Sequence, residues 1–217
     1  MTRKHLYLIS GLGADERAFQ HLRFPAEYEL HHLPWIPPLP NESISSYAAR
    51  MAESITADGP VSILGLSFGG IMSLEIAKIR PVEQNILISS IKHTSEKPSY
   101  FDWVLRLHLL QLPDFIIFQN RRFVVERYMD AQSPEEKQLL REYLSKKDYA
   151  YTRWAINVIL HWQNEYVPEN LVHINGDKDH PFPIKHVHPT HIIRNGGHFM
   201  VMNRAGEISR ILAETML

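Results

Sequence analysis

A serine between two glycines stands at the centre of the most informative stretch of the chain. Gly65-Leu66-Ser67-Phe68-Gly69 has the pattern Gly-x-Ser-x-Gly, between an apolar run at 61–66 and a helical pattern at 70–80. A tight strand-to-helix turn crowds the positions two before and two after its apex, where glycine avoids the clash. Such a turn would expose the Ser67 hydroxyl as a nucleophile and place the Phe68 N–H beside it as an oxyanion donor. By itself, the pattern also occurs in ordinary glycine-rich turns.

A serine hydroxyl is a poor nucleophile at neutral pH and needs a base, which in turn needs an acid to orient it. Two candidate acids, Asp177 and Asp179, follow the apolar run at 170–175. The candidate base is His198, which follows the paired glycines 196–197. Glycines there would let the backbone fold sharply enough for an imidazole to reach back to the serine. An aspartate-rich turn without a catalytic role would read the same way.

Strands and helices, which must position these residues, are predicted to alternate along the chain. Ser43 is predicted to cap a helix that Gly59 and Pro60 stop, and the last helix is predicted over about 204–216. Short apolar runs between helices are typical of an α/β fold with an open, mostly parallel sheet and helices on both faces. The six predicted strands are 6–9, 28–33, 61–66, 85–90, 170–175 and 190–193.

One stretch, from about 92 to 167, is helical throughout and has no convincing strand. Ser133 begins a capping box with proline at the first helical position, and Asp148 can cap the next helix. The sequence therefore predicts a single domain over 1–217 with a helical insertion, which is either a lid or a layer that completes the core.

Together these features resemble the α/β-hydrolase superfamily over nearly the whole chain, in a minimal form that lacks the family's first two strands. The family's order of nucleophile, acid and histidine implies Ser67, Asp179 and His198. Asp179 fits because the acid commonly lies three residues after a glycine, while Asp177 stays a competitor. The resemblance also implies that the loop after the first strand supplies a second oxyanion donor, the N–H of Leu12. There Ser10 stands where the family often has histidine.

Composition restricts the alternatives. The chain has 217 residues, 44% of them apolar, with a formal net charge of −1 and no cysteine. Disulfides, thiolate metal sites and a cysteine nucleophile are excluded, and the charge gives no reason to expect nucleic acid. No run approaches the roughly 20 apolar residues that span a bilayer, so we expect a cytoplasmic protein. Its oligomeric state is not readable.

Thirteen histidines raise the question of a metal. Four of them cluster near the candidate acids, and two of these, His186 and His188, would lie on one face of a strand, which can suit a metal. No third ligand follows this pair at a recognised spacing, and no nucleotide-binding motif is complete. We therefore predict no metal and no cofactor. The four are His180, His186, His188 and His191.

The sequence thus predicts a serine hydrolase that cleaves a carboxylic ester or thioester through an acyl-enzyme on Ser67. Abundant aromatic residues suggest an apolar acyl group, although we expect most of them in the core, where aromatic side chains supply much of the buried area. Two alternatives use the same fold: a ligand-binding receptor without turnover, and a lyase or acyltransferase with the same triad. The aromatic candidates are Trp35, Trp103, Phe115, Trp154 and Trp162.

Overall fold

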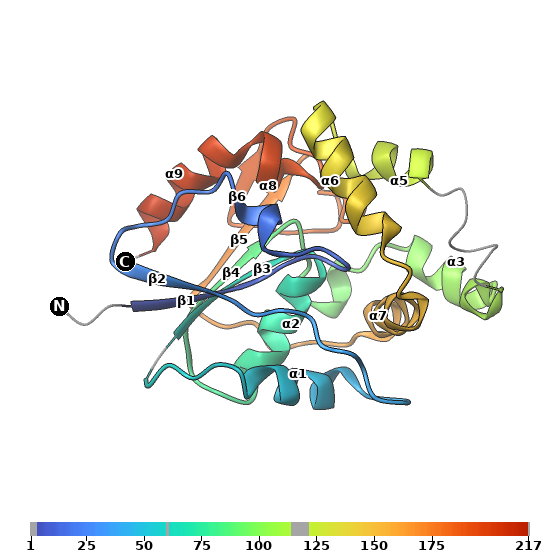
Figure 1. Ribbon diagram of the computed structural model, residues 1–217, viewed down its shortest axis with the longest axis horizontal. Helices are drawn as coiled ribbons and strands as arrows, with labels where there is room; N and C mark the ends of the chain where they lie inside the picture. Colours follow the sequence, from blue (N-terminus) through green and yellow to red (C-terminus); the bar gives the residue numbers. More distant parts are fainter. Residues whose placement is uncertain (1–3, 60, 114–121, 217) are drawn as a thin grey trace.

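All six predicted strands are present and pair in one parallel sheet, in the order β2-β1-β3-β4-β5-β6 (Figure 1). The computed structural model describes residues 4–59, 61–113 and 122–216, and side chains within that range except those of 122–124. The order of the strands reverses between β1 and β3, and open α/β sheets bind their ligands at such a switch point. The strands are β1 Lys4–Ile9, β2 Tyr28–His32, β3 Val61–Leu66, β4 Val82–Ile88, β5 Leu171–Gly176 and β6 His191–Ile193.

Side chains that alternate along each strand build a core on both faces of the sheet. In β1, Leu6 and Leu8 pack in one core cluster, and Tyr7 and Ile9 pack in the other. Two helices cover each face, as Figure 1 shows below and above the sheet. They are α1 Ile44–Ala52 and α2 Phe68–Ala77 on the Tyr7 face, and α8 Met200–Asn203 and α9 Ala205–Thr215 on the other.

Several elements end earlier than their patterns predict, among them β4 and α1. β4 stops at Ile88 because Ser89 adopts a positive φ of 48°, which a strand cannot contain. The helix capped by Ser43 stops at Ala52, well before Gly59. There the N–H groups of Ser54 and Ile55 bond three residues back, which tightens the chain out of the α-helix.

The predicted insertion is helical in its described part, and Figure 1 shows it beyond the carboxyl ends of the strands. Ser133 and Asp148 cap α6 and α7, each accepting a backbone N–H three residues on. Among the described residues, no helix is long and apolar enough to cross a membrane. The helices are α3 Tyr100–Arg106, α5 Arg122–Met129, α6 Pro134–Ser145 and α7 Tyr149–His161.

Two tryptophans anchor α7 to the rest of the domain. Trp162, just after α7, donates its indole N–H to the buried carboxylate of Glu75 on α2, at 2.8 Å. Trp154 within α7 donates to the backbone carbonyl of Glu42, also at 2.8 Å. Buried polar groups need such partners, so this side of the insertion is fixed to the face that carries α1 and α2.

A buried histidine predicts how stability depends on pH. His173 on β5 is fully buried, and burial lowers its pKa to about 4. An unfolded histidine has a pKa of about 6.5, so between that pH and about 4 the unfolded chain takes up a proton at this ring and the folded protein does not. The contribution of the neutral ring to stability is therefore complete above about pH 6.5 and is lost as the pH falls towards 4. We expect the free energy of unfolding to fall by up to about 1.4 kcal/mol per pH unit in that window from this group.

Urea unfolding at several pH values between 7 and 4 checks this expectation. The His173→Gln variant, which cannot take up the proton, should lose stability less steeply than wild type as the pH falls. Equal slopes in the two proteins would contradict it, whatever their stabilities at pH 7.

Candidate active site

Ser67 lies at the sharp turn between β3 and α2, where the backbone is strained. Its φ is 54° and its ψ is −117°, a conformation that non-glycine residues rarely adopt. A Cβ added at Gly65 would lie 2.3 Å from the Gly69 carbonyl oxygen, and one added at Gly69 would lie 2.2 Å from the Ile9 oxygen. Both glycines are therefore required by close backbone contact, as the sequence pattern predicts.

Neighbouring groups hold this turn in place. The Ser67 N–H donates to the Ile88 carbonyl at 2.9 Å, and the Ser67 carbonyl accepts from the Gly70 N–H at 2.9 Å. The buried hydroxyl of Ser90 also donates to the Ser67 carbonyl, at 2.7 Å. Strained backbone persists only where its surroundings fix it, so these bonds hold the partly buried Ser67 in place at the cavity.

Three predicted residues form a continuous chain of polar contacts. Ser67 Oγ lies 2.9 Å from His198 Nε2, and His198 Nδ1 lies 2.9 and 3.1 Å from the two carboxylate oxygens of Asp179. The side chains of His198 and Asp179 are 7% and 0% exposed. A buried carboxylate on Nδ1 keeps the proton there, which leaves Nε2 free to accept the serine proton.

The competing acid, Asp177, faces elsewhere. Its carboxylate accepts the backbone N–H of Asn195 at 2.7 Å and so fastens the loop after β6. Asp179 instead accepts the Phe182 N–H at 2.8 Å through one oxygen, in addition to facing His198. The structure therefore brings Asp179, and not Asp177, to the histidine.

The loop that carries His198 packs tightly on its surroundings. A Cβ added at Gly176 would lie 2.0 Å from the Gly196 carbonyl oxygen, and one added at Gly197 would lie 2.4 Å from Asp130 Cβ. The Phe199 N–H donates to the Met129 carbonyl at the end of α5, at 2.9 Å. The helical insertion thus contacts the histidine loop directly.

The loop after β1 lies against Ser67 at the point where the strand order reverses. A Cβ added at Gly11 would be 3.6 Å from Ser67 Cβ. Trp35 donates its indole N–H to the Gly11 carbonyl at 3.0 Å. The buried Ser10 hydroxyl donates to the Ala14 carbonyl at 2.9 Å, so serine at this position closes the turn.

The two predicted oxyanion donors, Leu12 and Phe68, lie in the loop after β1 and at the start of α2. Leu12 lines the cavity in front of Ser67. Phe68 is the first residue of α2, and the first N–H groups of a helix have no acceptor within it. Its buried ring stacks on Trp35 at 4.8 Å, which holds the start of the helix against the loop before α1.

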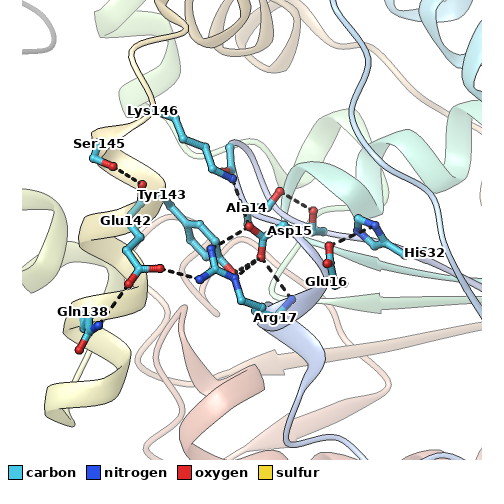
Figure 2. A network of polar contacts seen from close by, with 12 residues as sticks. Ala14, Asp15, Glu16, Arg17, His32, Gln138, Glu142, Tyr143, Ser145 and Lys146 are labelled. Atoms are coloured by element: carbon cyan, nitrogen blue, oxygen red, sulfur yellow. Dashed lines mark hydrogen bonds and ion pairs between the residues drawn. The ribbon is translucent and has the colours of Figure 1, made fainter.

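A network of charged residues joins the loop after β1 to α6 (Figure 2). Asp15 accepts hydrogen bonds from Arg17 Nε at 2.9 Å, the Tyr143 hydroxyl at 3.1 Å and Lys146 Nζ at 3.2 Å. Arg17 also pairs with Glu142 at 2.5 Å. The hydrogen bond from Arg17, together with the other donors, holds the pKa of Asp15 well below its usual range. The carboxylate is therefore charged at any physiological pH.

A cavity of about 710 Å³ opens in front of Ser67 and His198, between the sheet and the insertion. Its volume is in the usual range for small-molecule sites, and its walls are mainly apolar, with side chains from α3, α5, α6 and α7 and from the loops after β1 and β2. Among the polar groups in its wall, Tyr100 and Tyr128 stay neutral donors, because burial raises the pKa of both.

The predicted aromatic residues divide between cavity, core and surface. Trp35 lines the cavity, Trp162 is buried in the core, Trp154 is partly buried and packs against the core, and Trp103 is 61% exposed. Phe115 lies outside the described residues.

Sequence reasoning missed the network of Asp15, Arg17, Tyr143 and Lys146, in which Asp15 contacts two residues more than a hundred positions away. It also missed a pair of facing histidines, His5 and His31, on β1 and β2. The sequence signal that could have indicated this pair is the presence of a histidine on each of two neighbouring strands.

Comparisons with known proteins bear on the fold. No protein-family model and no curated protein sequence matches the chain. Solved structures do match over nearly its whole length. A lipase-esterase related protein from Clostridium acetobutylicum is 16% identical, with a TM-score of 0.68 and coverage of 98% of this chain and 94% of that one.

Two further structures agree. An esterase from Exiguobacterium antarcticum is 14% identical, with a TM-score of 0.69 and coverage of 98% and 91% of the two chains. A hydrolase from Pseudomonas aeruginosa is 10% identical, with a TM-score of 0.70 and coverage of 99% and 90%. At such low identities the likeness is one of architecture, and it agrees with the six parallel strands flanked by helices. The chain has the α/β-hydrolase fold.

Proposed function

We propose that the protein hydrolyses a carboxylic ester or thioester through a covalent acyl-enzyme on Ser67. The observation that carries this proposal is the chain from Ser67 Oγ through His198 to Asp179, with 2.9 Å at each step, at the wall of an apolar cavity. A strained nucleophile beside a base, itself oriented by a buried acid, is the arrangement that acyl transfer needs. The esterases and lipases among the matching structures agree with it.

The reaction would proceed in two halves. Ser67 Oγ attacks the carbonyl carbon while His198 Nε2 takes its proton, and the N–H groups of Phe68 and Leu12 stabilise the oxyanion. His198 then gives the proton to the leaving alcohol or thiol, and the acyl group stays on Ser67. A water molecule, deprotonated by His198, hydrolyses the acyl-enzyme, and the proton returns to Ser67.

The cavity favours an apolar acyl group. Its lining from the insertion includes Val104, Leu140, Leu144, Ile156 and Ile159. Each methylene that such a wall removes from water contributes about 0.8 kcal/mol, or up to about fourfold in kcat/KM. We expect kcat/KM for p-nitrophenyl esters to rise from acetate to hexanoate, measured at fixed pH. A preference for acetate would contradict the assignment of this wall to the acyl group.

Labelling with a fluorophosphonate tests the nucleophile without knowledge of the natural substrate. We expect intact-protein mass spectrometry to show one adduct on wild type, and none on Ser67→Ala or on heat-denatured wild type. Peptide mapping should place the adduct on Ser67. An adduct on another residue would refute the proposed mechanism.

Two outcomes separate the alternative functions. A folded wild type that binds an ester without labelling or consuming it would be a ligand-binding protein. A protein that labels but transfers the acyl group to an added alcohol in preference to water would be an acyltransferase.

A further inference from the structure

A second cluster of chemically active side chains lies away from the cavity, on β1 and β2. His5 Nδ1 and His31 Nε2 are 2.9 Å apart. A carboxylate oxygen of Glu29 lies near them, and the three potential ligand atoms are all within 4.8 Å of one another. In the described part of the chain, this is the group of three histidine or acidic side chains close enough to share one metal ion.

The parallel pairing of the two strands brings these residues together. His5 is opposite Glu29, and Tyr7 is opposite His31, two residues further along each strand. Because side chains alternate along a strand, all four lie on the same face of the sheet. His5 is near the amino end of β1, whereas Ser67 follows the carboxyl end of β3, so the cluster is separate from the candidate active site.

The ring of His31 is held by a buried neighbour. It stacks on Tyr7 with centroids 4.7 Å apart and an angle of 20°, and Tyr7 is only 3% exposed. The Tyr7 hydroxyl accepts the Ala57 N–H at 3.2 Å, which fixes that ring in turn. His31 is therefore oriented by the core, and binding there would cost little side-chain entropy.

Two imidazole nitrogens at 2.9 Å need something between them. Either one ring donates its N–H to the other, or a metal ion takes the place of that proton. Two nitrogens bound to one tetrahedral zinc, at about 2.05 Å each, lie about 3.3 Å apart. The rings need to separate by only about 0.4 Å from their present distance.

We propose that His5, Glu29 and His31 form a binding site for a divalent transition metal of the zinc type. Two imidazoles and one carboxylate are a ligand set that suits Zn²⁺, and water can complete the tetrahedron at this partly buried position. On binding, the ring that donates in the free protein moves its proton to its other nitrogen, and no proton need be lost. This site departs from the sequence prediction that the chain holds no metal.

The position of the site suggests its role. β2 is an edge strand, paired with β1 on one side. A metal bridging the two strands would cross-link that edge and stabilise the fold, independently of ester hydrolysis. The histidines at 180, 186, 188 and 191 do not converge in this way: His180 instead stacks on Tyr128, at 5.9 Å.

Calorimetric titration of EDTA-treated, dialysed protein with ZnCl₂ tests the proposal. We expect one equivalent to bind with a Kd of about 1 μM or tighter, and the Tm to rise with zinc concentration. Removing one ligand, in His31→Ala or Glu29→Gln, should weaken binding at least about tenfold. The matched control His188→Ala removes an exposed histidine of the other cluster and should bind as wild type does.

X-ray absorption of the zinc-loaded wild type gives a second readout that needs no variant. We expect two imidazole ligands at about 2.0 Å. Binding weaker than about 100 μM would overturn the proposal. So would an affinity that His31→Ala leaves unchanged, or a spectrum of oxygen ligands alone.

Discussion

Ser67→Ala is expected to lower kcat for an ester substrate by about a millionfold, the loss typical of a serine hydrolase without its nucleophile. Without Oγ, His198 has no hydroxyl to deprotonate, and only the oxyanion donors and substrate binding remain. KM should change little, because the cavity walls are intact. Steady-state kinetics on the best p-nitrophenyl ester, with single-turnover measurements for the variant, give both constants.

The variant must be folded for this result to count. Alanine is as strained as serine at a φ of 54°, so we expect the Tm of Ser67→Ala to stay within a few degrees of wild type. Retention of more than about a thousandth of the wild-type kcat would mean that another group performs the attack.

Asp179→Asn should have the next largest effect, a loss of about ten-thousandfold in kcat. Asparagine keeps the shape of the side chain, and its oxygen can still accept the Phe182 N–H. However, its amide can donate to His198 Nδ1, which would leave the ring's proton on Nε2, the atom that must act as base. The kinetic measurement is the same as for Ser67→Ala.

Asp177→Asn is the matched control, two residues away and with the same change of charge. Its side chain accepts the Asn195 N–H, which asparagine can also do, so we expect kcat within about threefold of wild type. A large loss in Asp177→Asn together with a mild one in Asp179→Asn would reverse the assignment of the acid.

Short sequence patterns predicted the strands and the turn at Ser67, because these depend on residues that are close together in the sequence. Short apolar runs between helical segments indicated all six strands, and the glycines at 65 and 69 indicated a tight turn. The structure shows why glycine is needed there, because an added Cβ would lie 2.3 and 2.2 Å from backbone oxygen atoms. The spacing implied by the family resemblance favoured Asp179 over Asp177, but it could not show which carboxylate faces His198. That direction depends on how the loops after β5 and β6 pack, which a sequence pattern does not contain.

Sequence patterns did not predict the contacts between segments that are far apart in the chain. Arg17 and Glu142 are 125 residues apart, and neither lies in a recognisable motif. The pairing of His5 with His31 depends on strand register, which becomes visible only when Tyr7 is found opposite His31. The sequence likewise made Trp162 a candidate for the cavity wall. In the structure its indole N–H donates to Glu75 in the core.

The bonds from the insertion to the two loops beside Ser67 have a consequence for substrate entry. Asp15 is bonded to Tyr143 and Lys146 of the insertion, and the Phe199 N–H is bonded to the Met129 carbonyl. Swinging α5 and α6 outward would break both sets of bonds, and would loosen the loops that carry Leu12, the proposed oxyanion donor, and His198, the proposed base. The proposed reaction would then proceed only while the insertion is closed over the cavity. Its turnover would therefore include the time that the insertion takes to close on each new ester.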